Sequence, residues 1–126
     1  MRLTIEGLTF INSELEKLNI PYEFGKWSTA IPDTFWIGSY TEIESLNEDG
    51  YEESTFILTG VTTKNKLSLL ETKDKIKDKF NNEGLTAILE SGSGIAIFYA
   101  NSNPIPSIEE NMERLEITLR IKEWRV

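Results

Sequence analysis

The last part of the chain alternates apolar and polar residues almost without interruption from Arg114 to Trp124. A period of two is typical of a β-strand with one buried face, because successive side chains of a strand point to opposite sides of the sheet. We therefore expect the core to receive Leu115, Ile117, Leu119 and Ile121. The other face, turned to solvent or to a partner, then carries Glu116, Thr118, Arg120 and Lys122. The chain is thus expected to end inside a sheet and not as a loose tail.

The chain has 126 residues, 39% of them apolar, which suits one compact domain over residues 1–126 that folds without disulfides or metal. It contains no cysteine and no histidine. A thiol nucleophile, a cysteine zinc site and the usual neutral-pH general base are therefore missing, and we expect no enzyme, no cofactor and no metal site. No apolar run has the length of a signal peptide or membrane span, so we expect a protein kept inside a cell, with no membrane partner.

The periodicity of the remaining chain predicts two helices and further strands. Apolar residues at helical spacing predict helices from about Thr4 to Leu18 and from about Asn65 to Asn82. Strands are predicted by aromatic and β-branched content and by the turn signals between them, over residues 35–41, 51–61, 85–90, 95–99 and 114–124. The order αββαβββ indicates an α+β two-layer domain, with a mostly antiparallel sheet and both helices packed on one face.

Several local signals refine this assignment. Ser68, three residues before Glu71, resembles a capping box, and Gly84 is a plausible stop for the second helix. The glycine-rich run over residues 91–94 predicts a turn between two strands, because a phosphate-binding loop should open into a helix. The polar run Asn101–Ser107 contains two prolines and predicts a long loop before the last strand.

The net charge of −8 is concentrated in one segment, because no Lys or Arg occurs from Ser28 to Thr63. Negative charge there comes from Asp33, Glu42, Glu44, Glu48, Asp49, Glu52 and Glu53. One interpretation is a solvated hairpin that keeps the protein soluble, and the other is an electrostatic surface for a partner or for the wall of a channel. An acidic surface repels phosphates, so we expect no sequence-specific nucleic-acid binding.

The same segment offers little support for catalysis or metal binding. Glu42 and Glu44 lie on one side of a predicted strand, but acid and base roles would require a pocket around them. The run Asn47–Gly50 lacks the ordered ligand spacing of a calcium loop.

Trp124 shares a strand face with Arg120 and Lys122, and an aromatic residue on an exposed strand can anchor an interface.

The whole pattern resembles that of phage tail-terminator or tail-completion proteins, which also occur at head-to-tail joining positions of long-tailed phages and prophage particles. The resemblance covers nearly the full chain. Its segments are Glu16–Tyr22, Asp33–Ile37, the acidic hairpin from Glu42 to Glu53, the lysine-rich helix predicted from about Asn65 to Asn82, and Leu115–Trp124. It is a resemblance of arrangement, since none of these segments is an invariant catalytic motif. Members of that family are small α+β proteins whose subunits form a hexameric ring.

The resemblance implies a structural subunit made in the bacterial host cytoplasm and located in the virion, at the head-tail junction. Its implied partners are further copies of itself in a ring, the tail tube protein and the head connector or neck protein, with a passage left for DNA. Residues expected at a subunit interface or along the channel are Glu42, Glu44, Glu48, Asp49, Glu52, Glu53, Arg120, Lys122 and Trp124.

The sequence is also compatible with a second class of function. Small, acidic, intracellular α+β domains also serve as inhibitors or immunity-type proteins, in which negative charge steers the molecule toward a basic partner. Stoichiometry separates the two hypotheses. The inhibitor would be a monomer or dimer bound to one basic protein, whereas the tail protein would form a ring.

Overall fold

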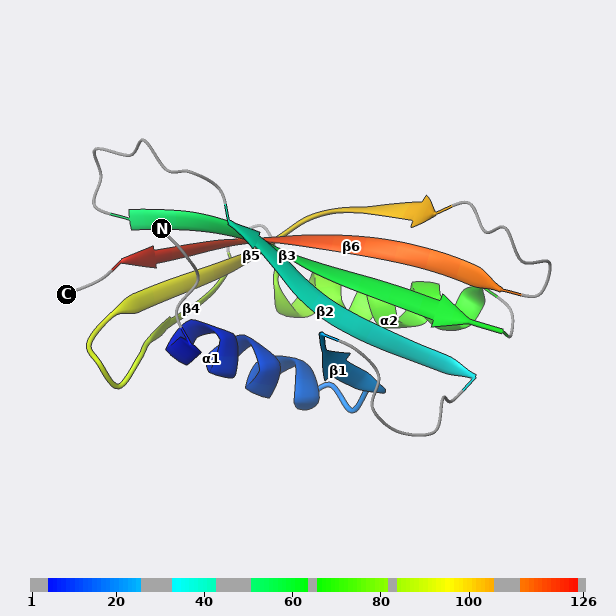
Figure 1. Cartoon of the computed structure of the whole chain (residues 1–126), viewed down its shortest axis with the longest axis horizontal. Coiled ribbons are helices and arrows are strands. Elements are labelled where there is room, and N and C mark those ends of the chain that lie inside the picture. Colours follow the sequence, from blue (N-terminus) through cyan, green and yellow to red (C-terminus); the bar gives the residue numbers. More distant parts are fainter. Residues whose placement is uncertain are drawn as a thin grey trace.

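The computed structural model describes residues 5–25, 33–42, 51–63, 66–81, 84–105 and 112–124. These ranges contain two helices and six strands, drawn in Figure 1. In chain order they are α1 (Ile5–Glu16), β1 (Tyr22–Phe24), β2 (Thr34–Glu42), β3 (Tyr51–Thr62), α2 (Leu67–Lys79), β4 (Leu85–Ile88), β5 (Gly94–Ile105) and β6 (Glu113–Trp124). Neither described helix is long and apolar enough to cross a membrane.

The strands form one six-stranded sheet in the order β1-β2-β3-β6-β5-β4. All neighbouring pairs are antiparallel except β1 and β2, which are parallel. The two central strands, β3 and β6, pair over their full length, from Tyr51 opposite Trp124 to Thr62 opposite Glu113. The predicted α+β class with a mostly antiparallel sheet is therefore confirmed.

One face of the sheet, called here the inner face, builds the core beneath both helices. The aliphatic residues predicted to be buried on β6 are at most 2% exposed, which confirms the alternation seen in the sequence. On β3, Phe56 and Leu58 lie opposite Leu119 and Ile117 and are also fully buried. The helices complete the same cluster with Ile11, Leu15, Leu69 and Ile76. Burying each such side chain contributes about 1.5–3 kcal/mol, so this shared cluster holds both helices on one face.

Two glycines on the inner face let aromatic rings lie directly against the sheet. A Cβ at Gly60 would stand 2.7 Å from ring atoms of Trp36, its neighbour on β2. A Cβ at Gly38 would stand 2.7 Å from the ring of Phe56 and would also meet Tyr22. Glycine is required at these positions because of close approach, since neither has a left-handed backbone.

Polar contacts connect the first helix to its surroundings. The Glu14 carboxylate, with the residue only 8% exposed, lies 3.8 Å from the Lys79 ammonium and thereby links α1 to the end of α2. The Tyr22 hydroxyl donates a hydrogen bond to Asn12 Oδ1, which ties β1 to α1. Burial, and secondarily the nearby Glu16 carboxylate, raise the pKa of Tyr22. Tyr22 therefore stays a protonated donor across the neutral range.

Three local predictions were wrong. Gly84 does not stop α2, which ends at Lys79 with Phe80 as its C-cap. Helix α2 begins at Leu67 after Lys66 and has no side-chain cap, because the Ser68 hydroxyl is placed near the hydroxyls of Thr62 and Thr34 on the sheet. The predicted loop over residues 101–107 begins as strand, since β5 continues to Ile105 after a register shift between Tyr99 and Asn101. Pro104 is tolerated there because β4 pairs only with the first part of β5, and proline is accepted on strand edges.

Candidate interaction surface

The other face of the sheet, called here the outer face, gathers four of the residues expected at an interface. On the central strands Glu53 lies opposite Lys122, and Arg120 and Trp124 are on either side of Lys122 on the same face. Residues directly opposite each other on antiparallel strands share a face, and so do residues two apart on one strand. We call Glu53, Arg120, Lys122 and Trp124 the outer-face cluster.

Within this cluster, Glu53 is already paired with a basic residue of its own chain. Its Oε1 atom accepts hydrogen bonds from Arg120 Nη2 at 2.6 Å and from Arg120 Nε at 3.0 Å. The pair crosses diagonally between β3 and β6, and both side chains are partly exposed. Exposed ion pairs contribute about 0.2–1 kcal/mol, so this pair fixes the orientation of two side chains more than it stabilises the fold.

The apolar part of the surface lies next to the cluster, at the end of the sheet. Trp124 is 39% exposed and Ile88 is 79% exposed. Between them lies Gly94, which is opposite both residues and has no side chain to separate them. The ammonium of Lys122 lies 5.8 Å from the centroid of the Phe98 ring, within cation–π range. An exposed tryptophan beside an exposed isoleucine is the kind of anchor that dominates binding energy at interfaces.

The structure describes only some of the other residues expected at an interface or along a channel. Glu42 ends β2 opposite Ser54, and Glu52 lies on β3 opposite Glu123, but the side chains of Glu42 and Glu52 are outside what the structure describes. Glu44, Glu48 and Asp49 lie outside the described residues altogether. Over the described ranges, no group of three or more acidic, histidine or cysteine side chains is arranged to hold a metal ion.

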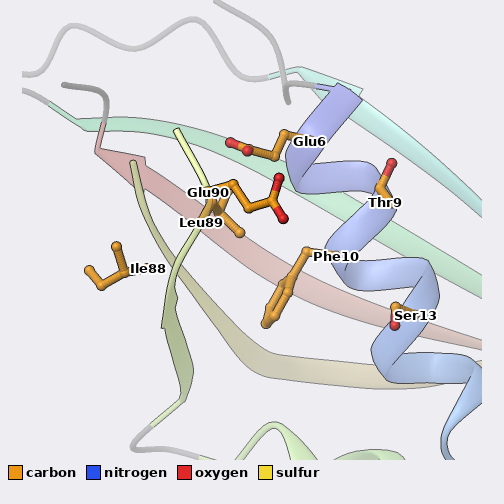
Figure 2. Close-up of a pocket in the computed structure, with 7 residues that line it drawn as sticks. All are labelled: Glu6, Thr9, Phe10, Ser13, Ile88, Leu89 and Glu90. Atoms are coloured by element: carbon orange, nitrogen blue, oxygen red, sulfur yellow. The ribbon is translucent and has the colours of Figure 1, made fainter. Parts of the chain in front are cut away.

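The structure also contains a groove that no pattern in the sequence indicates. It has a volume of about 490 Å³ and lies between α1 and the end of the edge strand β4, where Leu89 and Glu90 follow the strand. Figure 2 shows Phe10 reaching from α1 toward the strands, with Leu89 and Glu90 across from it. The full lining consists of Glu6, Thr9, Phe10, Ser13, Ile88, Leu89 and Glu90. The two walls are more than 70 positions apart in the sequence, so no local pattern could have indicated it.

A carboxylate is held in position at this groove. Ser91 donates to Glu6 from its hydroxyl, at 2.6 Å to Oε1, and from its backbone N–H, at 3.2 Å to Oε2. The Ser91 hydroxyl also lies 3.1 Å from that of Ser93 and accepts the Ser93 N–H at 3.3 Å. These contacts fasten the turn between β4 and β5 to the first turn of α1. They leave the groove with a preoriented negative charge.

Neither a comparison with protein-family models nor a search among curated proteins gives a significant match for this chain. A function is therefore inferred from two features of the molecule itself. One is the outer-face cluster with its neighbouring Ile88, and the other is the groove between α1 and β4.

Proposed function

We propose that this chain is a structural subunit of a phage or prophage tail, similar to tail-terminator proteins. Copies of it form a ring, taken as a hexamer, that caps the tail tube, contacts the head connector and leaves a passage for DNA. The observation that supports this proposal best is the outer-face cluster. Four residues expected at an interface lie together on one face of the sheet, and one of them is a partly exposed tryptophan.

The asymmetry of the molecule suits a ring. In a ring each subunit meets its neighbour through two different surfaces. Here the inner face is covered by both helices, whereas no described helix covers the outer face. The sheet has a short parallel strand, β1, at one edge and the short antiparallel strand β4 at the other. One copy therefore offers two unlike surfaces, as a closed heterologous assembly requires.

In the proposed ring, Trp124 packs against the neighbouring copy, and the acidic segment between Glu42 and Glu53 lies against basic residues of an adjacent copy or faces the channel. Tryptophan supplies a large contact area, and residues of this type are enriched among the few that carry most of an interface's energy. Opposite charges across the interface set the orientation of the subunits. The Glu53–Arg120 pair joins two side chains of the same subunit on the outer face.

The test is a Trp124→Ala variant studied by light scattering, alone and with tail tube subunits. We expect the parent chain to form a ring in at least one condition, and the variant to remain monomeric with an unchanged melting temperature. The matched control is Leu67→Ala, which truncates another exposed apolar side chain, 58% exposed, at the start of α2. That control should assemble like the parent.

Two outcomes would overturn the proposal. A Trp124→Ala variant that assembles as readily as the Leu67→Ala control would remove the outer-face cluster from the interface. A parent chain that stays monomeric in both conditions, and binds one basic protein at equal stoichiometry, would favour the inhibitor instead.

A further inference from the structure

We propose that β4, together with the groove between β4 and α1, is a docking site for an extended segment of a basic partner protein. The segment joins the sheet beside β4 as an additional strand. Its sequence alternates Lys or Arg with aliphatic residues. This site excludes the four residues of the outer-face cluster, shares Ile88 with the apolar surface beside it, and does not depend on ring formation.

The backbone of β4 has a hydrogen-bonding side that the described sheet does not use. β4 is the terminal strand of the described sheet, and its pairing with β5 starts at the Leu89 N–H, which donates to the Ser93 carbonyl at 2.8 Å. Hydrogen-bonded and non-hydrogen-bonded pairs alternate along an antiparallel ladder. Leu85 and Ala87 therefore bond toward β5, whereas Thr86 and Ile88 direct their N–H and C=O groups away from it.

Such an edge is a template for strand addition, in which main-chain hydrogen bonds supply affinity and side-chain pockets supply specificity. The groove lies at the end of this edge, where Ile88 belongs to its lining, and its volume of about 490 Å³ falls within the usual range of binding pockets. Side chains of an added strand point alternately to the two faces of the sheet. One set enters the groove against Phe10, and the other lies beside Ile88 on the outer face.

The charge of the groove selects the partner. Its lining includes the carboxylates of Glu6 and Glu90 and no Lys or Arg. No residue in the described ranges forms an ion pair with Glu90. Glu6 is already oriented by its two hydrogen bonds from Ser91. A Lys or Arg side chain entering the groove would therefore meet two negative charges without reorganising the site.

The partner is a different protein and not a second copy of this chain. Two copies joined through this site would bring Glu6 and Glu90 of one copy close to the same carboxylates of the other, whereas a basic segment is attracted. DNA is excluded as an occupant for the same reason, because its phosphates would meet the carboxylates of the groove. An extended polypeptide with positive charge can form hydrogen bonds with the N–H and C=O groups of β4 that the described sheet does not use. Its positive side chains can pair with the carboxylates of the groove.

The first experiment measures binding of a fluorescein-labelled hexapeptide of alternating arginine and valine to the full chain, by fluorescence anisotropy. The same peptide with glutamate in place of arginine is the control ligand. We expect saturable binding of the arginine peptide that weakens as salt rises, and none of the glutamate peptide. Failure of the arginine peptide to bind at any attainable concentration would overturn the proposal.

Matched variants separate this site from general attraction to an acidic protein. Thr86→Pro removes one outward N–H of β4 and leaves the bonds to β5 intact, whereas Thr86→Ala keeps that N–H. We expect at least tenfold weaker binding for Thr86→Pro and less than a twofold change for Thr86→Ala. The double variant Glu6→Gln and Glu90→Gln should also bind at least tenfold more weakly. Its control, Glu16→Gln and Glu71→Gln, makes the same change of charge outside the groove and should bind like the parent.

Amide hydrogen exchange of the parent chain, with and without the arginine peptide, tests the same site without any substitution that could destabilise the fold. The amides of Thr86 and Ile88 should exchange at least tenfold more slowly when the arginine peptide is bound. Unchanged exchange at both amides during saturation by the peptide, or equal weakening by both pairs of glutamine substitutions, would show that the peptide binds elsewhere.

Discussion

Replacing Gly60 by alanine tests how closely the sheet and its core are packed. The added Cβ would lie 2.7–2.8 Å from three ring atoms of Trp36. Carbon atoms in ordinary contact stand about 3.5–4.0 Å apart. Trp36 is fully buried in the core cluster, so its ring cannot move away without displacing its neighbours.

The free energy of unfolding should therefore fall. Overpacking of a close-packed core costs about 1–3 kcal/mol. Alanine recovers part of this, about 0.5–1 kcal/mol, because it restricts the unfolded chain more than glycine does. We expect a net loss of about 1–2 kcal/mol, which urea denaturation with a shared slope measures directly.

Two comparisons make the prediction strict. Gly94→Ala places a Cβ 3.7 Å from the Trp124 ring, an ordinary contact, and should leave stability unchanged or raise it by up to about 1 kcal/mol. In a Trp36→Leu background the ring is gone, so Gly60→Ala should stabilise the fold by about 0.5–1 kcal/mol, and the double-mutant cycle should return the overpacking cost of about 1–3 kcal/mol as coupling. If Gly60→Ala destabilises the Trp36→Leu background as much as the parent, the assigned ring contact is wrong.

Three further changes have defined outcomes. The first change replaces four acidic residues of the hairpin by glutamine: Glu48, Asp49, Glu52 and Glu53. The melting temperature should stay within a few degrees, because exposed charges seldom hold a fold together, but ring assembly should be impaired. Unchanged assembly in light scattering would remove the hairpin from the interface. Glu14→Ala should lower stability by about 1–2 kcal/mol in urea denaturation, because it deprives the partly buried Lys79 of a partner, whereas Glu16→Ala should not. Stability should decline as pH rises above about 10, because the folded state raises the pKa of Tyr22 and so disfavours the ionised form that the unfolded chain adopts. Tyr22→Phe should flatten that decline in unfolding curves at several alkaline pH values, and an identical decline in both proteins would contradict the assignment.

The sequence predicted the elements whose burial follows a regular period. The alternation on β6 was readable because that strand is central and has one buried face, which from Leu115 to Ile121 takes an apolar residue at every second position. The same reasoning placed α1 and α2 to within a few residues of their observed ends. It also placed Arg120, Lys122 and Trp124 on one strand face, but it did not identify β3 as the neighbouring strand.

Features that depend on contacts between distant segments were not predictable in this way. Local loop signals around Pro104 were overridden by pairing with β6. Ser68 resembled a helix cap, but its hydroxyl is directed to Thr62 on the sheet. The hydrogen bond between Ser91 and Glu6 at the groove joins residues 85 positions apart, and no local sequence pattern around either residue predicts this contact. Only the folded arrangement brings such groups together.

The central claim, that this chain is a ring-forming subunit at the head-tail junction, is tested most directly by its mass in solution. Light scattering over a concentration series, with and without tail tube subunits, distinguishes a monomer from a closed ring. The proposal predicts a ring, taken as six copies, in at least one of the two conditions. A strict monomer at every concentration in both conditions would contradict it.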